Sequence, residues 1–430
     1  MPPTQPLQIL ISGGGIAGTA LAYWLLQAQT PLEITIIERS PGPRPGGQAV
    51  DIRDSGVTVI RRMGIEQAIR DKTTTEKGID FVYRDGVSTA RFPMTGDTES
   101  QSFTSEFEIL RGDLADILEK NLGEIDGKGR VEWVFDEFVR EVVEVDGGRV
   151  RVKFMNHSKE REFDLVVGAD GMVSKTRRLV WGDGPGGMQF LKRVGQYMSF
   201  FTIKKEVGDT AFSPWYFTNK GRLAVTRPSP YDDRRVLLAV TDSNMSRFVG
   251  IEKAMKEGPE KQKQWLAKEF EGAGWITERL IKGMWETKDF YIQEIAQVKM
   301  GEEGWVKGRV ALCGDAGYCP SPISGMGTTS ALVGAYILAG EISKSPDDIP
   351  HALKRHQELL QPFIDEVQKL YPGTPWIVNP QSEWGIKVLN MAVTVASNTW
   401  VKWIGGSLGG MIGKFIGGKP WELPRYSAFD

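Results

Sequence analysis

The chain has 430 residues, of which 40% are hydrophobic and 25% are charged, so it can bury one or two sizeable cores. Its 53 basic and 55 acidic residues give a formal net charge of −2, which produces no field that would attract nucleic acid or an acidic membrane. The two cysteines, Cys313 and Cys319, share one apolar, glycine-rich stretch rather than a disulfide framework. Composition therefore predicts a cytoplasmic globular protein that binds no nucleic acid.

The first 38 residues predict one β-α-β unit. An apolar strand at residues 7–11 follows a short polar start in which no secretory signal is visible, and a helix at 19–26 and a second strand at 33–38 come after it. Such a unit opens a doubly wound parallel sheet. The proline- and glycine-rich residues 41–47 predict a loop, and a helix is expected near 57–63.

After residue 72 the pattern alternates between two kinds of structure. The alternating stretch at 79–83 and the strand-rich region 190–243 predict a second sheet outside the first. An amphipathic helix at 111–118 and buried strands at 164–168 and 310–313 belong with the first sheet instead. The chain should therefore leave its first domain, build a separate sheet and return.

The fold class that these elements predict is α/β, with a Rossmann-type domain on a doubly wound sheet, a second domain rich in β-sheet, and helices at the C-terminal end. We place the Rossmann-type domain at 1–72, 100–180 and 281–370, the second domain at 73–99 and 181–280, and the helical segment at 371–430.

The tail at 386–418 is apolar enough to be compared with a membrane span. Polar residues such as Lys387, Asn390 and Lys402 interrupt it, so it lacks the roughly 18 uninterrupted apolar residues that a span needs. We expect it to pack across the two domains or to lie on a surface, and we expect no membrane span.

The first motif is Gly13-x-Gly15-x-x-Gly18, between the first strand and its helix. Glycines let the backbone turn tightly and approach a pyrophosphate, whose charge the free N–H groups of the helix start can bind. Glu38, twenty residues beyond Gly18, stands where an acid accepts hydrogen bonds from ribose hydroxyls. The motif therefore predicts a dinucleotide with a free 2′-hydroxyl on its adenosine, such as FAD or NAD.

The second motif runs from Gly168 to Arg177 and contains Asp170-Gly171 after a buried strand. Two interpretations of it stay open. Asp170 could support a ligand, or the segment could be only a helix start that Ser174 caps while Arg177 lies in solvent.

The third motif combines residues 308–316, ending in Gly314-Asp315-Ala316, with residues 320–327 and an apolar helix from 328 to 342. A strand ends at an acid, a proline-rich turn follows, and glycines open a helix whose N–H groups face whatever lies at its start.

Together the three motifs resemble those of the class A, single-component FAD-dependent monooxygenases of the aromatic-hydroxylase type. Residues 46–53 and 422–426 are most similar to the branch of the tetracycline-inactivating monooxygenases. The resemblance implies that Asp170 supports FAD and the passing nicotinamide and that Asp315 contacts the ribityl chain or the pyrophosphate. It further implies that Pro322 abuts the isoalloxazine and that Arg111 contacts FAD.

The chain departs from the family pattern at two places in the third motif. Gly317-Tyr318 replaces the usual histidine, and Thr328 or Thr329 and Gly334 replace a later asparagine and aspartate. These departures affect flavin contacts on that side rather than the whole cofactor site.

The expected cofactor-binding residues come from the three motifs, the first loop and the start of the helix at 111. They are Gly13, Gly15, Ile16, Ala17, Gly18, Glu38, Arg39, Arg44, Gly47, Arg111, Asp170, Asp315, Pro322, Gly325 and Gly327. Arg44 and Arg53 are also candidates for guiding nicotinamide or substrate, since a guanidinium stays protonated.

The resemblance implies that NADPH or NADH transiently reduces non-covalently bound FAD, that O2 adds at the flavin C4a carbon, and that the hydroperoxide transfers one oxygen atom to the substrate. Hydroxylation, epoxidation and Baeyer–Villiger insertion all remain open. No acid or base is identified, because His157, His351 and His356 lie in hydrophilic segments and are expected to be solvated. No metal site is expected.

The substrate pocket is expected in the second sheet, where Met198, Phe200, Trp215 and Phe217 cluster and where Phe201 and Tyr216 extend the same aromatic surface. Such walls favour a hydrophobic, polycyclic small molecule, as in secondary metabolism or antibiotic modification. Two alternatives remain: an FAD-dependent dehydrogenase or oxidase, and a non-catalytic binding protein on the same fold. A monomer or a homodimer is expected.

Overall fold

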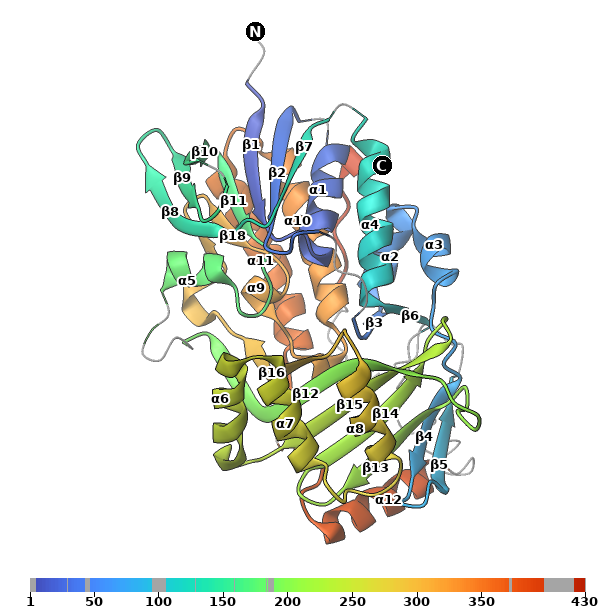
Figure 1. Ribbon diagram of the computed structural model, residues 1–430. Coiled ribbons are helices and arrows are strands. Elements are labelled where there is room, and N and C mark those ends of the chain that lie inside the picture. Colours follow the sequence, from blue (N-terminus) through green and yellow to red (C-terminus); the bar gives the residue numbers. More distant parts are fainter. Residues whose placement is uncertain are drawn as a thin grey trace.

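A six-stranded sheet forms the centre of the upper domain in Figure 1, in the order β17-β18-β11-β1-β2-β7. The computed structural model describes residues 5–28, 30–42, 47–94, 106–127, 129–157, 159–182, 184, 189–370, 373–397 and 421–429. The strands are β1 (Leu7–Ser12), β2 (Leu32–Glu38), β7 (Val131–Phe135), β11 (Leu165–Gly168), β17 (Val306–Lys307) and β18 (Val310–Leu312). All pairs are parallel except β17 with β18.

The strand β1 is apolar because it is covered on both faces. Ile9, Leu10 and Ile11 are all fully buried although successive side chains point to opposite faces of the sheet. The small sheet of β10 (Arg161–Phe163), β9 (Arg149–Phe154) and β8 (Val139–Val145) packs against β1 and β11, and the helix α1 (Ile16–Gln27) packs against both α4 (Arg111–Ile125) and α10 (Gly327–Lys344). The prediction of a doubly wound, Rossmann-type sheet is therefore confirmed.

The remaining elements of the upper domain surround this sheet. The helices are α1 (Ile16–Gln27), α2 (Ser55–Arg62), α3 (Glu66–Arg70), α4 (Arg111–Ile125), α5 (Lys175–Trp181), α9 (Asp315–Tyr318), α10 (Gly327–Lys344) and α11 (Ile349–Val367). The short strands are β3 (Ala49–Ile52), which pairs with β6 (Phe107–Leu110), and β8 (Val139–Val145), β9 (Arg149–Phe154) and β10 (Arg161–Phe163). Two 3-10 turns are η3 (Gly301–Glu303) and η4 (Pro322–Ser324).

A seven-stranded sheet forms the lower domain, in the order β16-β12-β15-β14-β13-β4-β5. The strands are β4 (Gly78–Val82), β5 (Ser88–Pro93), β12 (Leu191–Lys204), β13 (Ser213–Thr218), β14 (Arg222–Pro228), β15 (Asp233–Thr241) and β16 (Tyr291–Val298). The helices α6 (Val249–Glu257), α7 (Pro259–Glu269) and α8 (Thr277–Glu286) cover the face that is in front in Figure 1, with η2 (Ser246–Phe248) before them.

The predicted return to the first domain at residue 281 is wrong. Residues 291–298 form β16, which is hydrogen-bonded to β12 in the second sheet, and α8 also packs on β12. The chain re-enters the first domain only after Val298. The first half of β16 is mostly half-buried and its second half is buried, and residues of either kind occur in both sheets, so the sequence pattern does not say which sheet it joins.

The tail contacts both domains. The helix α12 (Glu383–Ser397) lies against the seven-stranded sheet, where Ile386, Leu389 and Val393 pack. Residues 421–429, which include η5 (Ser427–Phe429), return to the upper domain, where the Tyr426 hydroxyl donates to Glu341 at 2.8 Å. Residues 398–420, on which part of the tail prediction falls, lie outside the described residues.

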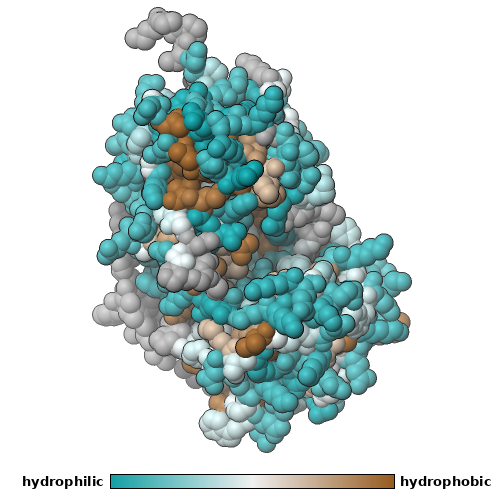
Figure 2. Space-filling model, turned by 60° about the vertical axis from the view of Figure 1, so that its left-hand side comes forward, coloured by the Kyte–Doolittle hydropathy of each residue, from teal (hydrophilic) through white to brown (hydrophobic). Residues whose placement is uncertain are grey.

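No helix in the described part of the chain is long and apolar enough to cross a membrane. Figure 2 shows a mainly hydrophilic face, with a hydrophobic strip on its upper half.

The two departures from the family pattern are complementary in space. Tyr318 is buried, and its hydroxyl oxygen lies 1.9 Å from the place that a Cβ on Gly334 would occupy. Its hydroxyl donates to the Cys313 sulfur at 3.5 Å, and both cysteines are free and buried. The glycine in α10 thus makes room for the tyrosine of α9.

We expect Gly334→Ala to lower the free energy of unfolding by about 1–3 kcal/mol, because a buried ring cannot move away from the added methyl group without strain. Gly123→Ala, in the exposed part of α4, is the matched control: nothing lies within 4 Å of its added Cβ, so stability should stay the same or rise by up to about 1 kcal/mol. Urea unfolding of both variants measures this, and an unchanged Gly334→Ala would contradict the packing.

The prediction that all three histidines are solvated is wrong for His356. His157 and His351 are exposed, but His356 is fully buried on the inner face of α11, 6.4 Å from the Trp305 ring. Loss of hydration lowers the pKa of His356 to about 3, so the ring is neutral in the folded protein. The charged residues around it in the sequence belong to the outer face of the helix.

This burial predicts acid sensitivity. Because the folded-state pKa lies below the unfolded value of about 6.5, the unfolded chain binds the proton first, and stability is lost as the pH falls below about 6.5 towards 3. We expect the contribution to reach about 2 kcal/mol at pH 5. His356→Leu should flatten the fall of unfolding free energy between pH 6.5 and pH 4, whereas His351→Leu on the exposed face should leave the slope unchanged.

Candidate functional site

The glycine loop after β1 is held by close backbone contacts. A Cβ on Gly13, which has φ +115°, would lie 2.5 Å from the Ala169 carbonyl oxygen, and one on Gly18 would lie 2.0 Å from the Gly13 oxygen. No other residue fits at either place. The loop lies where β1 has β2 on one side and β11 on the other, the switch point at which open α/β sheets bind ligands.

Glu38, at the end of β2, supports this loop directly. It is only 7% exposed, and its carboxylate accepts hydrogen bonds from the main-chain N–H groups of Gly14 at 3.1 Å and of Ser40 at 2.9 Å. The neighbouring Arg39 is exposed. Glu38 therefore has two roles: it fixes the glycine loop through a hydrogen bond, and it forms part of the wall of the cleft beside this loop.

This cleft has an aromatic wall that the sequence motifs do not reveal. Trp133 and Phe135 of β7 stack at 5.5 Å with an interplanar angle of 11°, and Phe135 lies opposite Glu38 in the strand register. The facing helix α4 contributes Asp116 and Glu119, and desolvation followed by the charge of Asp116 raises the pKa of Glu119. Aromatic residues at alternate positions of a strand next to Glu38 are the signal that could have found this wall.

Arg111 begins α4 and faces the same cleft. Its nearest guanidinium nitrogen lies 3.9 Å from the place of a Cβ on Gly15, and its side-chain stem lies 3.2 Å from that of Gly47. The guanidinium makes no ion pair or hydrogen bond with any of the described residues, and the side chain is exposed. An unpaired guanidinium beside a glycine loop is suited to a phosphate or another anionic group.

Asp315 lies between β18 and α10. Its side chain is accessible, yet protein surrounds it closely enough that desolvation raises the pKa of its carboxyl, while Cys319 and the charge of Arg111 act in the opposite direction. One carboxylate oxygen lies 3.8 Å from the place of a Cβ on Gly327, at the start of α10. An acidic side chain that solvent reaches but that protein largely surrounds is typical of the wall of a cleft. In such a place Asp315 can accept hydrogen bonds from ligand hydroxyls.

Asp170 is engaged within its own segment. Its carboxylate accepts hydrogen bonds from the main-chain N–H groups of Lys175 and Thr176, both at 2.9 Å. Ser174 caps α5 as expected, but Arg177 is buried rather than solvated and donates to the Ala316 carbonyl at 2.7 Å. The second motif thus supports the third motif, and a direct contact of Asp170 with cofactor stays a prediction.

Of the other expected cofactor residues, Ile16 lines the cleft, whereas the remaining described ones belong to the third motif or contact it. Ala17 packs against Gly314, Pro322 is exposed, and Gly325 lies next to the ion pair between Asp51 and Arg53, whose charged atoms are 3.1 Å apart. The main-chain N–H of Arg53 also donates to the Thr329 hydroxyl. The role of Arg53 in guiding nicotinamide stays a prediction. Arg44 lies outside the described residues.

The expected pocket residues share one face of the seven-stranded sheet. This substrate-side cluster consists of Ile79, Phe81, Ala90, Val194, Met198, Phe200, Phe217, Leu223, Val225, Ala239 and Ile295, with Trp215, Tyr291 and Ile323 packed against it. Ile323 comes from η4, so the cluster touches the turn of the third motif. Phe201 and Tyr216 are on the opposite face under α6–α8, which corrects the expectation that they extend the same surface.

The residues around the cleft fit an FAD molecule. A glycine loop at a helix start and an unpaired Arg111 suit the pyrophosphate, Glu38 and the aromatic wall suit the adenosine, and the accessible Asp315 suits hydroxyl groups. The acids near the adenosine would repel a 2′-phosphate.

Comparison with known proteins agrees with this geometry. Residues 6–345 match the family described as FAD binding domain. The chain is 33% identical to the FAD-dependent monooxygenase asL6 of Sarocladium schorii over 99% of both chains, and 34% identical to the monooxygenase CTB7 of Cercospora beticola over 92% of this chain and 93% of the relative. It is similar to the crystal structure of tetracycline destructase Tet(55), with a TM-score of 0.74, 30% identity and coverage of 99% and 100%.

The chain therefore belongs to the FAD-binding-domain family, and it is an FAD-dependent monooxygenase of that family. The resemblance seen in the three motifs, including that to the tetracycline-inactivating branch, is confirmed.

Two aspartate variants should separate cofactor binding from structural support. Asp315→Asn should weaken FAD binding roughly tenfold or more, because it removes a charged acceptor, and should leave the stability of the apoprotein unchanged or higher. Asp170→Asn should instead lower the free energy of unfolding by about 1–3 kcal/mol, because its oxygens hold the start of α5. FAD titration and urea unfolding of both apoproteins measure the difference, and the same profile for both variants would contradict it.

Proposed function

We propose that this monooxygenase takes electrons from NADPH or NADH and uses O2 to insert one oxygen atom into a hydrophobic, polycyclic small molecule. The observation that carries the proposal is the contact of Ile323 with the substrate-side cluster. It sets an apolar, aromatic sheet face directly against the turn that, by family resemblance, lies beside the isoalloxazine.

FAD, when bound, supplies the redox chemistry and the activation of O2. The residues of the chain bind the cofactor and the substrate, orient them, and exclude water. The glycine loop and Arg111 would hold the pyrophosphate, and Asp315 would accept hydrogen bonds from the ribityl hydroxyls. The substrate-side cluster supplies a dry wall that favours oxygen transfer over loss of the oxidant to water.

Trp215, which packs against the substrate-side cluster, carries a hydrogen-bond donor. The indole N–H of Trp215 is buried and has no partner in the described part of the chain. Buried polar groups are normally paired, so this N–H fits an acceptor on the ligand, such as a carbonyl or phenol oxygen of a ring system. The name of Tet(55) points to tetracycline, itself a polycyclic compound, which supports the same substrate class.

The nicotinamide cofactor is proposed to bind transiently. The sequence contains one glycine loop of the dinucleotide type, and FAD takes that site. The nicotinamide is therefore proposed to bind over the flavin rather than at a second glycine loop.

Turnover under isotopically labelled O2 tests the reaction class. With NAD(P)H and a polycyclic phenol, the proposal expects one labelled oxygen atom in the product, found by mass spectrometry. Substrate oxidation without label, with hydrogen peroxide released in equal amount, would identify an oxidase instead. An apoprotein that binds the phenol but no FAD would point to a binding protein.

Substrate preference follows from the same sheet face. We expect NAD(P)H oxidation to be stimulated by neutral polycyclic or prenylated compounds at least about tenfold more than by hydroxybenzoates, because contact area and stacking supply the binding energy. A benzoate would need a fixed cationic clamp. Arg227 and Arg235 share this sheet face, but both are engaged in ion pairs, Arg227 with Glu76 and Glu108 and Arg235 with Asp233 and Asp289. Best coupled turnover with a hydroxybenzoate would show that the substrate lies elsewhere.

A further inference from the structure

Arg227 of β14 forms ion pairs with two buried acids at once. Its Nε atom donates to Glu76 Oε2 at 2.9 Å, and its Nη2 atom donates to Glu108 Oε2 at 3.1 Å. Only 1% of the Glu76 side chain and 3% of the Glu108 side chain are exposed, and the other carboxylate oxygen of each lacks a partner among the described residues. A buried carboxylate is costly unless it is paired, so both acids depend on this guanidinium.

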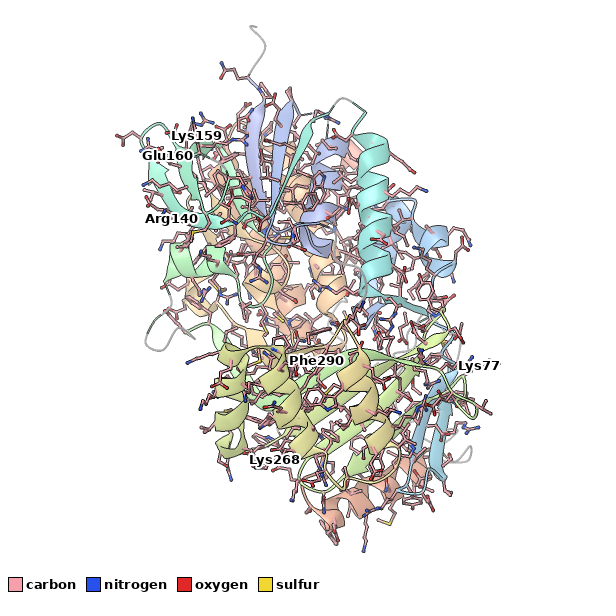
Figure 3. All side chains as sticks on the ribbon, in the orientation of Figure 1. Lys77, Arg140, Lys159, Glu160, Lys268 and Phe290 are labelled. Carbon is pink, nitrogen blue, oxygen red and sulfur yellow. The ribbon has the colours of Figure 1, made fainter. Side chains whose placement is uncertain are left out.

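The two acids belong to different domains. Glu76 also accepts a hydrogen bond from the hydroxyl of Ser213, the first residue of β13, at 2.6 Å, so it is fixed to the seven-stranded sheet. Glu108 belongs to the two-stranded ribbon of β3 and β6, which lies at the lower end of the upper domain in Figure 1. In Figure 3, Lys77, which follows Glu76, lies close to the level at which the two domains meet. The guanidinium of Arg227 therefore bridges the domain boundary.

The β3–β6 ribbon places two acids face to face. Glu108 lies directly opposite Asp51 in the antiparallel register, and like charges at such positions repel each other. Each acid has a guanidinium against it: Arg53 lies 3.1 Å from Asp51, and Arg227 lies 3.1 Å from Glu108. The ribbon thus takes part of its charge compensation from the other domain.

The same ribbon carries groups of the cofactor side. Arg111 follows Glu108 by three residues, and its main-chain N–H donates to the Gln48 carbonyl, just before β3, at 3.0 Å. On β3, one carboxylate oxygen of Asp51 lies 3.5 Å from the place that a Cβ on Gly325, in the third motif, would occupy. A shift of the ribbon would therefore move Arg111 and change the contact with the third motif.

We propose that Arg227 is a positioning residue that fixes the substrate sheet relative to the cofactor cleft. Val225, two residues away on β14 and on the same face, belongs to the substrate-side cluster. The two ion pairs of Arg227 therefore hold this cluster at a set place relative to Arg111 and the third motif. Buried ion pairs suit this task, because any misplacement leaves a buried charge without its partner. The inference rests on the proposed substrate wall and adds the residue that keeps the wall aligned with the flavin.

Arg227→Met tests the inference, and Arg279→Met is the matched control. The Arg279 side chain is 21% exposed, as is that of Arg227, and it also pairs with two acids, Glu206 and Asp209, but all three of these residues lie in the second domain. We expect Arg227→Met to weaken FAD binding to the apoprotein roughly fivefold, because the ribbon that carries Arg111 loses its anchor. Acrylamide should also quench the fluorescence of the bound flavin more strongly. Arg279→Met should lower the stability and leave both flavin measurements unchanged.

Glu108→Leu gives an independent readout, because it removes the acid on the other side of the boundary. If the two residues act through one ion pair, the losses of FAD affinity in Arg227→Met and Glu108→Leu should not add in the double variant. Should Arg227→Met not fold, the same measurements on Glu108→Leu decide. Fully additive losses, or wild-type affinity and quenching in the folded variants, would overturn the inference. A wild-type enzyme that binds FAD but oxygenates no polycyclic phenol would instead overturn the proposed function.

Discussion

The close approach of the glycine loop to the end of β11 is the contact on which the rest of the site depends. The backbone at Gly13 and the Ala169 carbonyl are so near that no side chain fits between them. This brings the first motif against the second, and the buried Arg177 then joins the second to the third through Ala316. Three segments separated by more than 100 residues thus form one surface at the switch point of the sheet.

Three acids of these motifs have different environments and therefore different tasks. Glu38 is buried and accepts a hydrogen bond from the glycine loop. The Asp170 carboxylate accepts a main-chain hydrogen bond at the start of α5, and Asp315 remains accessible. An acidic residue at the end of three strands of one parallel sheet need not mean three ligand contacts. Hydrogen-bond partners, rather than position in a motif, indicate which carboxylate is left for a cofactor.

The seven-stranded sheet carries apolar side chains on both of its faces, and the two faces have different surroundings. Along β12, Phe200 faces the cofactor side and Phe201 faces the helices α6–α8, because side chains alternate between the faces of a sheet. One face packs against the helices α6–α8, and the other contacts the third motif through Ile323. In the proposed function, a single sheet thus serves as a domain core and as a wall for a substrate.

Local patterns in the sequence were sufficient for the fold class, for the glycine loop and for the cofactor family, since strand, turn and helix signals lie within a few residues of one another. They did not reveal that β16 joins the second sheet, that His356 is buried, or that Trp133 and Phe135 line the cleft beside the glycine loop. Each of these depends on which distant segment packs against the residue. Burial and pairing across the chain set hydration and available partners, so only the tertiary structure decided which histidine loses its charge and which aromatic residues line the cleft.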